Sequence, residues 1–437
     1  MRTQKRIDMK LKIYTLGCKV NQYESEVMVK LLEKEGVTKA AKDETADIVI
    51  INSCTVTAQS DQKVRQTLRR TKKNNPGSVT VLTGCMAQAF PEESAKLQEA
   101  DIILGTAGRD RLWSHIQSFM ATRQRIVDVE EHKKGEKFES MQVDSFSERT
   151  RAFIKIEDGC NRFCSYCIIP YSRGRVRSKD INELKCEVEQ LAKNGYKEIV
   201  LTGINLSCFG QDTGLHLCDA IETACAVEGV ERVRLGSLEP EQLSADVVAR
   251  MAKQQKLCPQ FHLSLQSGCD ATLKRMNRHY DSDEYRQIVK NIRESFHNPA
   301  ITTDIMVGFA GETEEEFEQS LNFAKEISFA KVHVFAYSRR PGTKAYDAPN
   351  QVHNRTKEDR SRRMIEATLK TQRDFFESQI GLDETVLFER EVDKNLWEGY
   401  TMNYTPVLAA SSKDISGEIL PVRLTDVTGD HCVGTII

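Results

Sequence analysis

Three cysteines near the middle of the chain, Cys160, Cys164 and Cys167, have the spacing C-x3-C-x2-C. Thiolates at this spacing can converge on one metal centre, but they supply three ligands where iron–sulfur cubanes and structural zinc sites usually take four. No histidine follows within reach, and the next cysteine, Cys186, lies on the polar side of a predicted amphipathic helix. A cluster held by three thiolates leaves one iron open, and an open iron can chelate a substrate or cofactor. The spacing therefore indicates a reactive iron–sulfur centre.

Two other interpretations of the same cysteines are open. A zinc site would need a distant fourth ligand, and paired C-x2-C spacing is more usual for zinc. A disulfide framework is disfavoured because the chain has 13 cysteines, an odd number, and no signal peptide is recognisable before them. Clustered cysteines in a cytosolic chain bind metal more often than they form disulfides.

In the first part of the chain, short apolar runs alternate with stretches of helical periodicity. This hydrophobic pattern predicts the strands and helices of that region. The predicted strands are Lys12–Leu16, Asp47–Asn52 and Ser78–Thr83, and the predicted helices are Glu24–Lys34, Gln62–Lys73 and Glu92–Gln98. Strands alternating with helices predict an α/β fold, here a doubly wound parallel sheet with helices on both faces. We place this amino-terminal domain at residues 9–126.

Three further cysteines, Cys18, Cys54 and Cys85, each fall just past one of these predicted strands. They recur at about one βαβ period, so each occupies the same place in a successive unit. Because the carboxyl ends of neighbouring parallel strands form the ligand crevice of such a sheet, we expect these thiols to meet at one edge. The alternative is that they are small buried residues at strand ends, which is common for free cysteine.

The central motif, with Tyr166 beside its last cysteine, resembles the signature of the radical S-adenosylmethionine (SAM) enzymes. In that superfamily, three thiolates hold a 4Fe–4S cluster whose open iron binds the amino and carboxylate groups of SAM. The resemblance implies that Cys160, Cys164 and Cys167 are the catalytic cluster ligands, and that Tyr166 lies at the cofactor.

The amino-terminal motifs resemble the methylthiotransferases. They are Thr15-Leu16-Gly17-Cys18-Lys19-Val20-Asn21-Gln22-Tyr23-Glu24-Ser25, Asn52-Ser53-Cys54-Thr55-Val56-Thr57 and Gly84-Cys85-Met86-Ala87-Gln88. The first is most similar to the branch that acts on N6-threonylcarbamoyladenosine in tRNA. The resemblance spans nearly the whole chain and implies a second 4Fe–4S cluster, held by Cys18, Cys54 and Cys85.

A second domain, which we place at residues 150–372, follows a charged stretch at 127–149 that we interpret as a linker. Its predicted helices include Ser282–Phe296 and Thr313–Ile327, and its predicted strands are Phe153–Glu157, Glu198–Thr202, Arg232–Gly236, Phe261–Gln266, Ile301–Val307 and Lys331–Tyr337. Six βα units are too few to close an eight-stranded barrel, so we predict a partial (β/α)6 radical SAM barrel. Active sites of β/α barrels lie at the carboxyl ends of the strands, where the cluster loop is also expected.

Polar residues and glycines at these strand ends suit a cofactor site. The residues predicted to contact SAM, besides Tyr166, are Gly203, Asn205, Ser237, Glu239, Gln266, Ser267, Arg278, Val307 and Phe309. Each can also be read as turn chemistry or as a surface charge. The chain departs from the family at Ala310 and Ala336, which replace usual prolines. His262 and His333 alternate with apolar neighbours, which favours hydrogen-bonded structural roles.

After Gly381 the pattern turns to period two. The predicted strands are Glu384–Glu391, Leu396–Met402, Thr405–Ala409, Glu418–Leu424 and Cys432–Ile436. They predict a small antiparallel β-barrel, residues 373–437, similar to the TRAM-like module of RNA-modifying enzymes. Its Trp397, Tyr400 and Tyr404 either stack on bases or belong to the core.

Net charge is −2 over 437 residues, so a nucleic-acid partner must be met by local basic patches. Candidate phosphate-binding groups are Arg173, Arg175, Arg177 and Lys179; Arg339 and Arg340; Arg65, Arg69, Arg70, Lys72 and Lys73; and Arg360, Arg362 and Arg363. Any one group can instead be a solvated helix face. No apolar run reaches the length of a membrane span, so we expect a cytoplasmic protein without a membrane partner.

The resemblance implies a complete reaction. A 5′-deoxyadenosyl radical made from SAM at the first cluster removes hydrogen from carbon 2 of the modified adenine beside the anticodon (position 37). The second cluster presents methylated sulfur to the resulting carbon radical. The implied partners are the tRNA anticodon stem-loop, a reducing protein such as a flavodoxin or ferredoxin, and a sulfur donor. The alternatives are isopentenyladenosine or a ribosomal protein as acceptor, or a non-catalytic RNA-binding protein with structural zinc.

Overall fold

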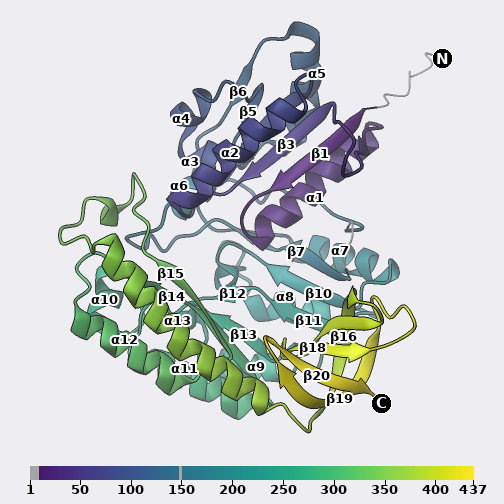
Figure 1. Ribbon diagram of the computed structural model, residues 1–437. Helices are drawn as coiled ribbons and strands as arrows, with labels where there is room; N and C mark the ends of the chain where they lie inside the picture. The colour runs from purple at the N-terminus through teal and green to yellow at the C-terminus, as the bar shows by residue number, and fades with distance from the viewer. Residues whose placement is uncertain (1–8, 147–149) are drawn as a thin grey trace. The chain divides into compact units, whose positions relative to one another are not determined.

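The structure is a computed structural model that describes residues 9–146 and 150–437. The chain divides into two compact units (Figure 1). Unit 1 contains the described part of Met1–Val143 together with Asp158–Lys179 and Ser338–Tyr346. Unit 2 contains the described parts of Asp144–Glu157, Asp180–Tyr337 and Asp347–Ile437. The segment that carries Cys160, Cys164 and Cys167 therefore belongs to the amino-terminal unit, although the sequence placed it in the second domain.

Unit 1 is built on a six-stranded parallel sheet with the order β2-β1-β3-β4-β5-β6. The strands are β1 (Lys10–Thr15), β2 (Thr38–Lys39), β3 (Ile48–Ser53), β4 (Val79–Gly84), β5 (Ile102–Leu104) and β6 (Ile126–Asp128). The three strands that precede the cysteines, β1, β3 and β4, are direct neighbours, with Thr15 paired to Asn52 and Asn52 to Thr83. The predicted parallel sheet is confirmed, and β2, β5 and β6 extend it.

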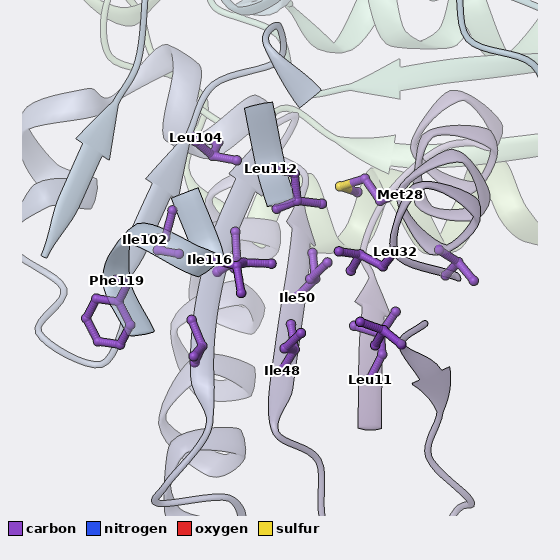
Figure 2. Packing of buried hydrophobic residues seen from close by; sticks show 14 residues of the cluster. Leu11, Met28, Leu32, Ile48, Ile50, Ile102, Leu104, Leu112, Ile116 and Phe119 are labelled. Atoms are coloured by element: carbon purple, nitrogen blue, oxygen red, sulfur yellow. The ribbon is translucent and has the colours of Figure 1, made fainter. Parts of the chain in front are cut away.

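Helices cover both faces of this sheet, as the pattern predicted. On one face α1 (Lys19–Lys34) and α5 (Leu112–Thr122) pack on alternate strand residues, and Figure 2 shows Met28, Leu32, Leu112 and Ile116 meeting Ile48 and Ile50. On the other face lie α2 (Ala58–Asn74) and α3 (Cys85–Ala89), which pack on Ile51, Leu82 and Ile103. The remaining helical pieces of this region are α4 (Pro91–Ala95) and η1 (Arg109–Arg111).

The segment predicted as a linker is partly structured. Val127 lies inside β6, and residues as far as Val143 belong to unit 1. Glu139 accepts hydrogen bonds from the backbone amide and guanidinium of Arg109, which ties this charged stretch to the domain. Polar contacts of this kind leave no hydrophobic period in the sequence, and the segment also buries Val143 and Phe146. Residues 147–149 of the predicted linker lie outside the described part of the chain.

Unit 2 contains six consecutive parallel strand positions. They are β7 (Arg151–Lys155), β10 (Glu198–Thr202), β11 (Arg232–Leu235) continued by β12 (Ser237–Leu238), β13 (Gln260–Leu263), β14 (Ala300–Val307) and β15 (Lys331–Ala336). Two sheets, β11-β10-β7 and β12-β13-β14-β15, share this run, because the strand breaks at Gly236 and each half pairs with a different neighbour. The order confirms the partial (β/α)6 barrel.

Helices alternate with these strands along the chain (Figure 1). They are α7 (Ile181–Lys193), α8 (Leu217–Ala226), α9 (Ala245–Ala252), α10 (Asp270–Arg275), α11 (Ser282–Ser295), α12 (Glu314–Ile327) and α13 (Asn354–Glu377), with short turns η2 (Leu206–Cys208), η3 (Pro240–Gln242) and, in unit 1, η4 (Lys344–Tyr346). Cys186 lies on the exposed side of α7, as expected. Within the described residues, no helix is both long and apolar enough to cross a membrane.

The carboxy-terminal strands close into the predicted β-barrel, in the order β16-β17-β18-β20-β19. The neighbours pair antiparallel, as predicted, except for β18 and β20, which pair in parallel. They are β16 (Asp383–Asp393), β17 (Leu396–Thr401), β18 (Pro406–Ala410), β19 (Ile419–Thr428) and β20 (His431–Ile436). Their inward residues form a core with Val386, Phe388 and Val407, to which Trp397 belongs at 7% exposure. Of the two interpretations of Trp397, the structure therefore supports the core.

Tyr400 and Tyr404 stack on each other, with ring centroids 4.6 Å apart. Arg151 lies over both rings, at 5.1 and 5.0 Å, and Arg234 lies over Tyr404 at 4.6 Å. Arg234 also donates to the carbonyls of Met402 and Thr401. The two tyrosines thus join the β-barrel to the (β/α)6 strands, and arginines occupy the ring faces that we considered for bases.

Glu198 is the counter-charge of this junction. Its carboxylate is 2.7 Å from Arg234, 3.7 Å from Arg232 and 3.9 Å from Arg151, and it is fully buried. Burial alone would raise the pKa of the Glu198 carboxyl, but Arg234 and then Arg151 and Arg232 outweigh it and hold the pKa below its ordinary value. Two buried arginines therefore depend on one carboxylate.

We expect Glu198→Gln to lower the free energy of unfolding at pH 7 by roughly 3–5 kcal/mol, because it leaves buried guanidinium groups uncompensated. A carboxyl with a depressed folded pKa contributes its stability above its unfolded pKa, and loses it as pH falls through the folded value. The deficit of the variant should therefore persist at pH 7 and shrink only at strongly acidic pH. Urea unfolding as a function of pH measures it. Asp383→Asn, in an exposed pair with Arg423, is the control and should leave the free energy of unfolding nearly unchanged; an equal loss in the two variants would contradict this account.

Candidate functional site

Cys18, Cys54 and Cys85 lie at the carboxyl ends of the three neighbouring strands β1, β3 and β4. Cys18 immediately precedes α1, Cys54 follows Ser53 at the end of β3, and Cys85 begins α3. The prediction that the βα repeat brings these three residues to one edge of the sheet is confirmed.

The loops that carry these cysteines are in direct contact. A Cβ at Gly17 would lie 2.8 Å from Cys54 Cβ and 3.2 Å from its Sγ, and Gly17 has a φ of +118°. Asn21 Nδ2 donates to Leu16 O and Ser53 O at 2.8 and 2.9 Å, which locks the first loop against the second. Any larger residue at position 17 would push the two cysteine loops apart.

The third loop is fixed to the second in the same way. Ser53 Oγ donates to the carbonyl of Thr83, and it accepts from the amide of Met86. A Cβ at Gly84, where φ is +95°, would approach Ser53 O to 2.6 Å. The three cysteine loops therefore form one connected rim.

Two of the three thiols lose their protons less readily than an ordinary cysteine. Cys54 and Cys85 are buried, whereas Cys18 is exposed at the rim. The protein packed around Cys18 raises the pKa of its thiol to about 11. Arg173 acts to lower this pKa, whereas Cys85 and Cys54 add to the rise. Burial likewise raises the pKa of the Cys54 thiol, and Cys85 adds to it. Three thiolates this close need a cationic partner.

Arg173 supplies a positive charge from the central cysteine motif. It ends α6 (Ile169–Arg173), which follows Cys167, and its side chain is fully buried. Its Nε donates to Cys85 Sγ at 3.3 Å, and its Nη atoms donate to Asn21 Oδ1 at 2.7 Å and to Glu24 Oε1 at 2.5 Å. One side chain therefore connects the segment of the central cysteines to the amino-terminal trio.

The charge of Arg173 is balanced within unit 1. Burial by itself would lower the pKa of its guanidinium, but Cys85, Glu24 and Asp158 outweigh it and hold the pKa well above the ordinary value. Glu24 also pairs with the buried Arg109 at 3.0 Å, and Arg109 pairs with Glu139 at 2.6 Å. The result is a buried network that fixes α1, η1 and α6 around the amino-terminal cysteines.

Cys160, Cys164 and Cys167 lie on a loop that folds back on itself. The amide of Cys160 donates to Gly174 O at 3.0 Å, and the amide of Cys167 donates to Cys164 O at 2.9 Å. A Cβ at Gly159, where φ is +88°, would lie 2.0 Å from the carbonyl of Arg175. All three cysteines are half-buried, so the loop presents its thiols on an accessible side.

A second connection joins the two cysteine regions. In the segment Ser338–Tyr346 the amide of Ala345 donates to Ser165 O at 2.8 Å, within the central motif. Arg340 of the same segment is buried and donates to Thr55 Oγ1 at 2.7 Å and to Asp61 at 2.6 Å, directly after Cys54. All six candidate ligands thus lie in one compact unit.

Each cysteine trio has the donor type that holds an iron–sulfur cubane. Among the described residues, no three His, Cys, Asp or Glu side chains are placed to hold a single ion. A cubane differs because each thiolate binds a different iron atom. Each trio offers three thiols, and Arg173 supplies the hydrogen bond to sulfur that anionic cluster ligands commonly receive.

The predicted SAM residues other than Tyr166, which belongs to unit 1, lie in unit 2, and two of them contact each other. Arg278 forms an ion pair with Glu239, and its Nη2 also donates to Ser264 O at 3.1 Å. Tyr280 donates to Ser264 O and lies beside the same guanidinium. The sequence singled out Glu239 and Arg278 separately and gave no sign of this pair.

Gly203 and Asn205 surround a buried carboxylate that the sequence analysis missed. A Cβ at Gly203 would lie 2.6 Å from Glu157 Oε2, and the same oxygen accepts from the amide of Asn205 at 2.7 Å. Glu157 is fully buried in the short strand β8 (Glu157–Asp158), two residues past the first barrel strand β7. The signal was present as an acidic residue just before the Asp158-Gly159-Cys160 turn.

The other predicted cofactor residues differ in exposure. Ser237 is exposed, and Tyr166 and Gln266 are half-buried, with Gln266 at a φ of +67°. The side chains of Ser267, Val307 and Phe309 are buried, Phe309 packing edge-on to Tyr337, so they could reach a ligand only through the main chain. His262 contacts Thr302 Oγ1 at 3.0 Å, in line with its expected structural role.

Several arginines predicted to bind phosphate are buried in ion pairs, and Lys179 is buried against the carbonyl of Met141. Arg173, Arg177 and Lys179 are at most 8% exposed, as are Arg340 and Arg360, while Arg175 lies over the Phe163 ring. Arg360 pairs with Glu312 and Glu314, Arg363 with Glu314 and Glu318, and exposed Arg362 with Asp359. These predictions were wrong for the buried residues, because sequence alone does not show which charges find partners far along the chain.

Comparison with known proteins agrees with this geometry. The uncharacterized protein family UPF0004 matches residues 10–105, and the radical SAM superfamily matches residues 154–324. The chain is 37% identical to the threonylcarbamoyladenosine tRNA methylthiotransferase MtaB of Bacillus subtilis (strain 168), over 94% of this chain and 92% of that protein. It is 36% identical to the tRNA-2-methylthio-N(6)-dimethylallyladenosine synthase of Clostridium tetani (strain Massachusetts / E88), over 94% and 93%.

Among solved structures, the chain is similar to the radical S-adenosylmethionine methyltransferase TsrM from Kitasatospora setae, which holds cobalamin and a 4Fe–4S cluster. The TM-score is 0.58 with 13% sequence identity, and the match covers 78% of this chain and 77% of that one. This likeness concerns the fold alone.

Proposed function

This chain belongs to the radical SAM tRNA methylthiotransferases, and from that premise we propose that it methylthiolates carbon 2 of N6-threonylcarbamoyladenosine beside the anticodon, at position 37. The observation that carries the proposal is the placement of both cysteine trios in one compact unit, with Arg173 joining them. An enzyme that activates a carbon and inserts sulfur at it needs two such centres close together.

In this proposal Cys160, Cys164 and Cys167 hold one 4Fe–4S cluster, and Cys18, Cys54 and Cys85 hold the other. When bound, the first with SAM supplies a radical able to remove an unactivated hydrogen, and the second supplies sulfur. The protein's own work is placement. The connected rim at Gly17 and Gly84 sets the positions of the three amino-terminal thiols, and Gly159 allows the tight return of the central loop.

Unit 2 carries the predicted SAM residues other than Tyr166. Glu239 and Arg278 carry the charges that complement the ammonium and carboxylate of SAM. Glu239 follows β12, at a strand carboxyl end, where barrel enzymes bind their ligands, and Arg278 reaches it from the turn after α10. Glu157 holds the Gly203–Asn205 turn through the amide of Asn205, so that its backbone is preorganised. Ser267, Val307 and Phe309, whose side chains are buried, would meet the cofactor through their main chain.

The proposed reaction also defines partners. The two centres need electrons and replacement sulfur from outside the chain, which points to a flavodoxin or ferredoxin and to a sulfur donor. A tRNA substrate places the reaction in the cytoplasm. The closed barrel of strands β16 to β20 is consistent with an RNA ligand, since small β-barrels of this size commonly bind nucleic acid.

The choice of nucleoside rests on the run Cys18-Lys19-Val20-Asn21 and on relatives with both names, so it needs a direct test. Purified anaerobic enzyme should be offered two tRNAs in parallel, one with threonylcarbamoyladenosine and one with dimethylallyladenosine, and the digested nucleosides weighed by mass spectrometry. We expect a gain of one methylthio group on the first only. Product on the second alone would reassign the substrate to the dimethylallyladenosine branch, which the relative from Clostridium tetani represents.

A further inference from the structure

The outward face of α2 carries a stripe of polar and basic residues with no acidic member. The exposed residues of the stripe are Gln59, Gln62, Lys63, Gln66, Arg70 and Lys73. At 100° per residue these positions fall within one side of the helix, opposite to Val64 and Leu68, which pack on the sheet. Figure 1 shows α2 as the long helix along one face of the amino-terminal sheet.

The structure divides the basic residues of α2 into two sets. Arg65 is 3.8 Å from Glu93, Arg69 is 3.4 Å from Glu99, and Lys72 is 2.7 Å from Asp101, so these three lie on a flank where acidic side chains meet them. In the part of the chain that the structure describes, no carboxylate lies within ion-pair distance of Lys63, Arg70 or Lys73. The sequence analysis included Arg70 and Lys73 in one basic group with the paired residues and omitted Lys63.

The stripe begins beside a candidate reaction centre. Thr57 caps α2, three residues after Cys54, and accepts from the amide of Ser60. Lys63 lines an open polar recess of about 570 Å³ with Thr57, Gln59, Ser60, Gln62 and Gln66. From Lys63 to Lys73 the helix rises about 15 Å, long enough to follow several consecutive phosphates.

We propose that this stripe of α2 binds the sugar–phosphate backbone of the tRNA and leads it toward the Cys54 end of the helix. Lysine and arginine contact phosphate oxygens, and glutamine amides contact phosphate and sugar, without reading sequence. A membrane surface does not fit, because the stripe has no apolar residues to insert. The inference rests on the proposed tRNA substrate and adds the surface that holds it.

The test compares two double variants of equal charge. Lys63→Gln/Arg70→Gln removes two stripe charges, and Arg65→Gln/Arg69→Gln removes two ion-paired charges from the same helix. Each anaerobic holoenzyme is titrated with tRNA purified from cells lacking methylthiolation, between 50 and 300 mM KCl, by fluorescence anisotropy. All four positions are on the helix surface, so unfolding temperature and SAM cleavage should match the wild type and report intact folding.

We expect the stripe variant to bind about tenfold more weakly at 50 mM KCl, and its log–log salt slope to fall by about 2, one for each lost phosphate contact. The paired-residue variant should keep nearly the wild-type slope. Equal tRNA affinities and salt slopes in the two variants overturn the inference. Unchanged tRNA binding in the stripe variant, together with slower reduction by an acidic flavodoxin, also overturns it and would assign the stripe to that partner. If the wild type itself binds no tRNA, the proposed function fails, and not merely this surface.

Discussion

Cys54→Ala should leave reductive cleavage of SAM intact and abolish methylthio transfer to tRNA. Cys54 belongs to the trio at the ends of β1, β3 and β4, whereas the cluster that meets SAM is assigned to Cys160, Cys164 and Cys167. The two measurements are 5′-deoxyadenosine formed per chain and methylthiolated nucleoside formed per chain, in the same anaerobic reaction. We expect the first to stay within about twofold of the wild type, and the second to disappear.

Two further cysteine variants bracket this prediction. Cys160→Ala should remove both products, because no radical is made. Cys186→Ala should remove neither, since Cys186 is exposed on α7 and belongs to no trio. Sulfur transfer that survives in Cys54→Ala at the wild-type rate would mean that the amino-terminal cysteines have only a structural role.

Arg173→Gln should be the most damaging single change of a non-cysteine residue in unit 1. It removes a cationic partner from Glu24, which is fully buried and also pairs with Arg109, and it removes the donor to Cys85 Sγ. Breaking a buried ion pair costs roughly 3–5 kcal/mol. We expect lower stability to urea, together with loss of about half of the bound iron after anaerobic reconstitution, and Arg173→Lys should recover part of each.

The matched control for Arg173 is Arg175→Gln. Arg175 is two residues away, exposed, and lies over the Phe163 ring at 4.8 Å, so its removal should change stability by less than about 1 kcal/mol. The double variant Glu24→Gln/Arg173→Gln should lose less free energy of unfolding than the two single variants lose together, because neither charge then lacks the other. Additive losses would show that the contact between Arg173 and Glu24 is not the source of the effect.

The edge that collects Cys18, Cys54 and Cys85 could be predicted because its cause is local and periodic. Each βα unit ends its strand at the same edge of the sheet, and the parallel pairing of neighbouring strands brings those ends together.

Helix boundaries were predicted less accurately. The helix expected from Gln62 begins at Ala58, because Thr57 caps it through the amide of Ser60, and that signal was present in the sequence.

The roles of charged residues could not be predicted in the same way. Arg173 and Arg340 read as surface cations, yet each pairs with a partner more than one hundred residues away, Glu24 and Asp61 respectively. Nothing near either arginine in the sequence marks that partner. The same holds for Tyr400 and Tyr404, whose ring faces are covered by Arg151 and Arg234.

The assignment of the central cysteine loop to unit 1 depends on similar long-range contacts. Sequence order groups Cys160 with the barrel strands that flank it, and the family match to residues 154–324 follows that order. The contacts of Arg173 with Cys85 and of Ala345 with Ser165 instead hold the loop among the amino-terminal elements. A contact that joins residues so far apart leaves no period or composition change to detect.

The most direct test of the whole account is the iron and acid-labile sulfide content of three anaerobically reconstituted proteins. The wild type should bind about eight iron atoms per chain, four for each cubane. The triple variants Cys18→Ala/Cys54→Ala/Cys85→Ala and Cys160→Ala/Cys164→Ala/Cys167→Ala should each bind about four, with the characteristic brown absorption retained. A wild type that binds only about four, or an amino-terminal variant that loses no iron, would contradict the claim that this chain holds two three-cysteine centres.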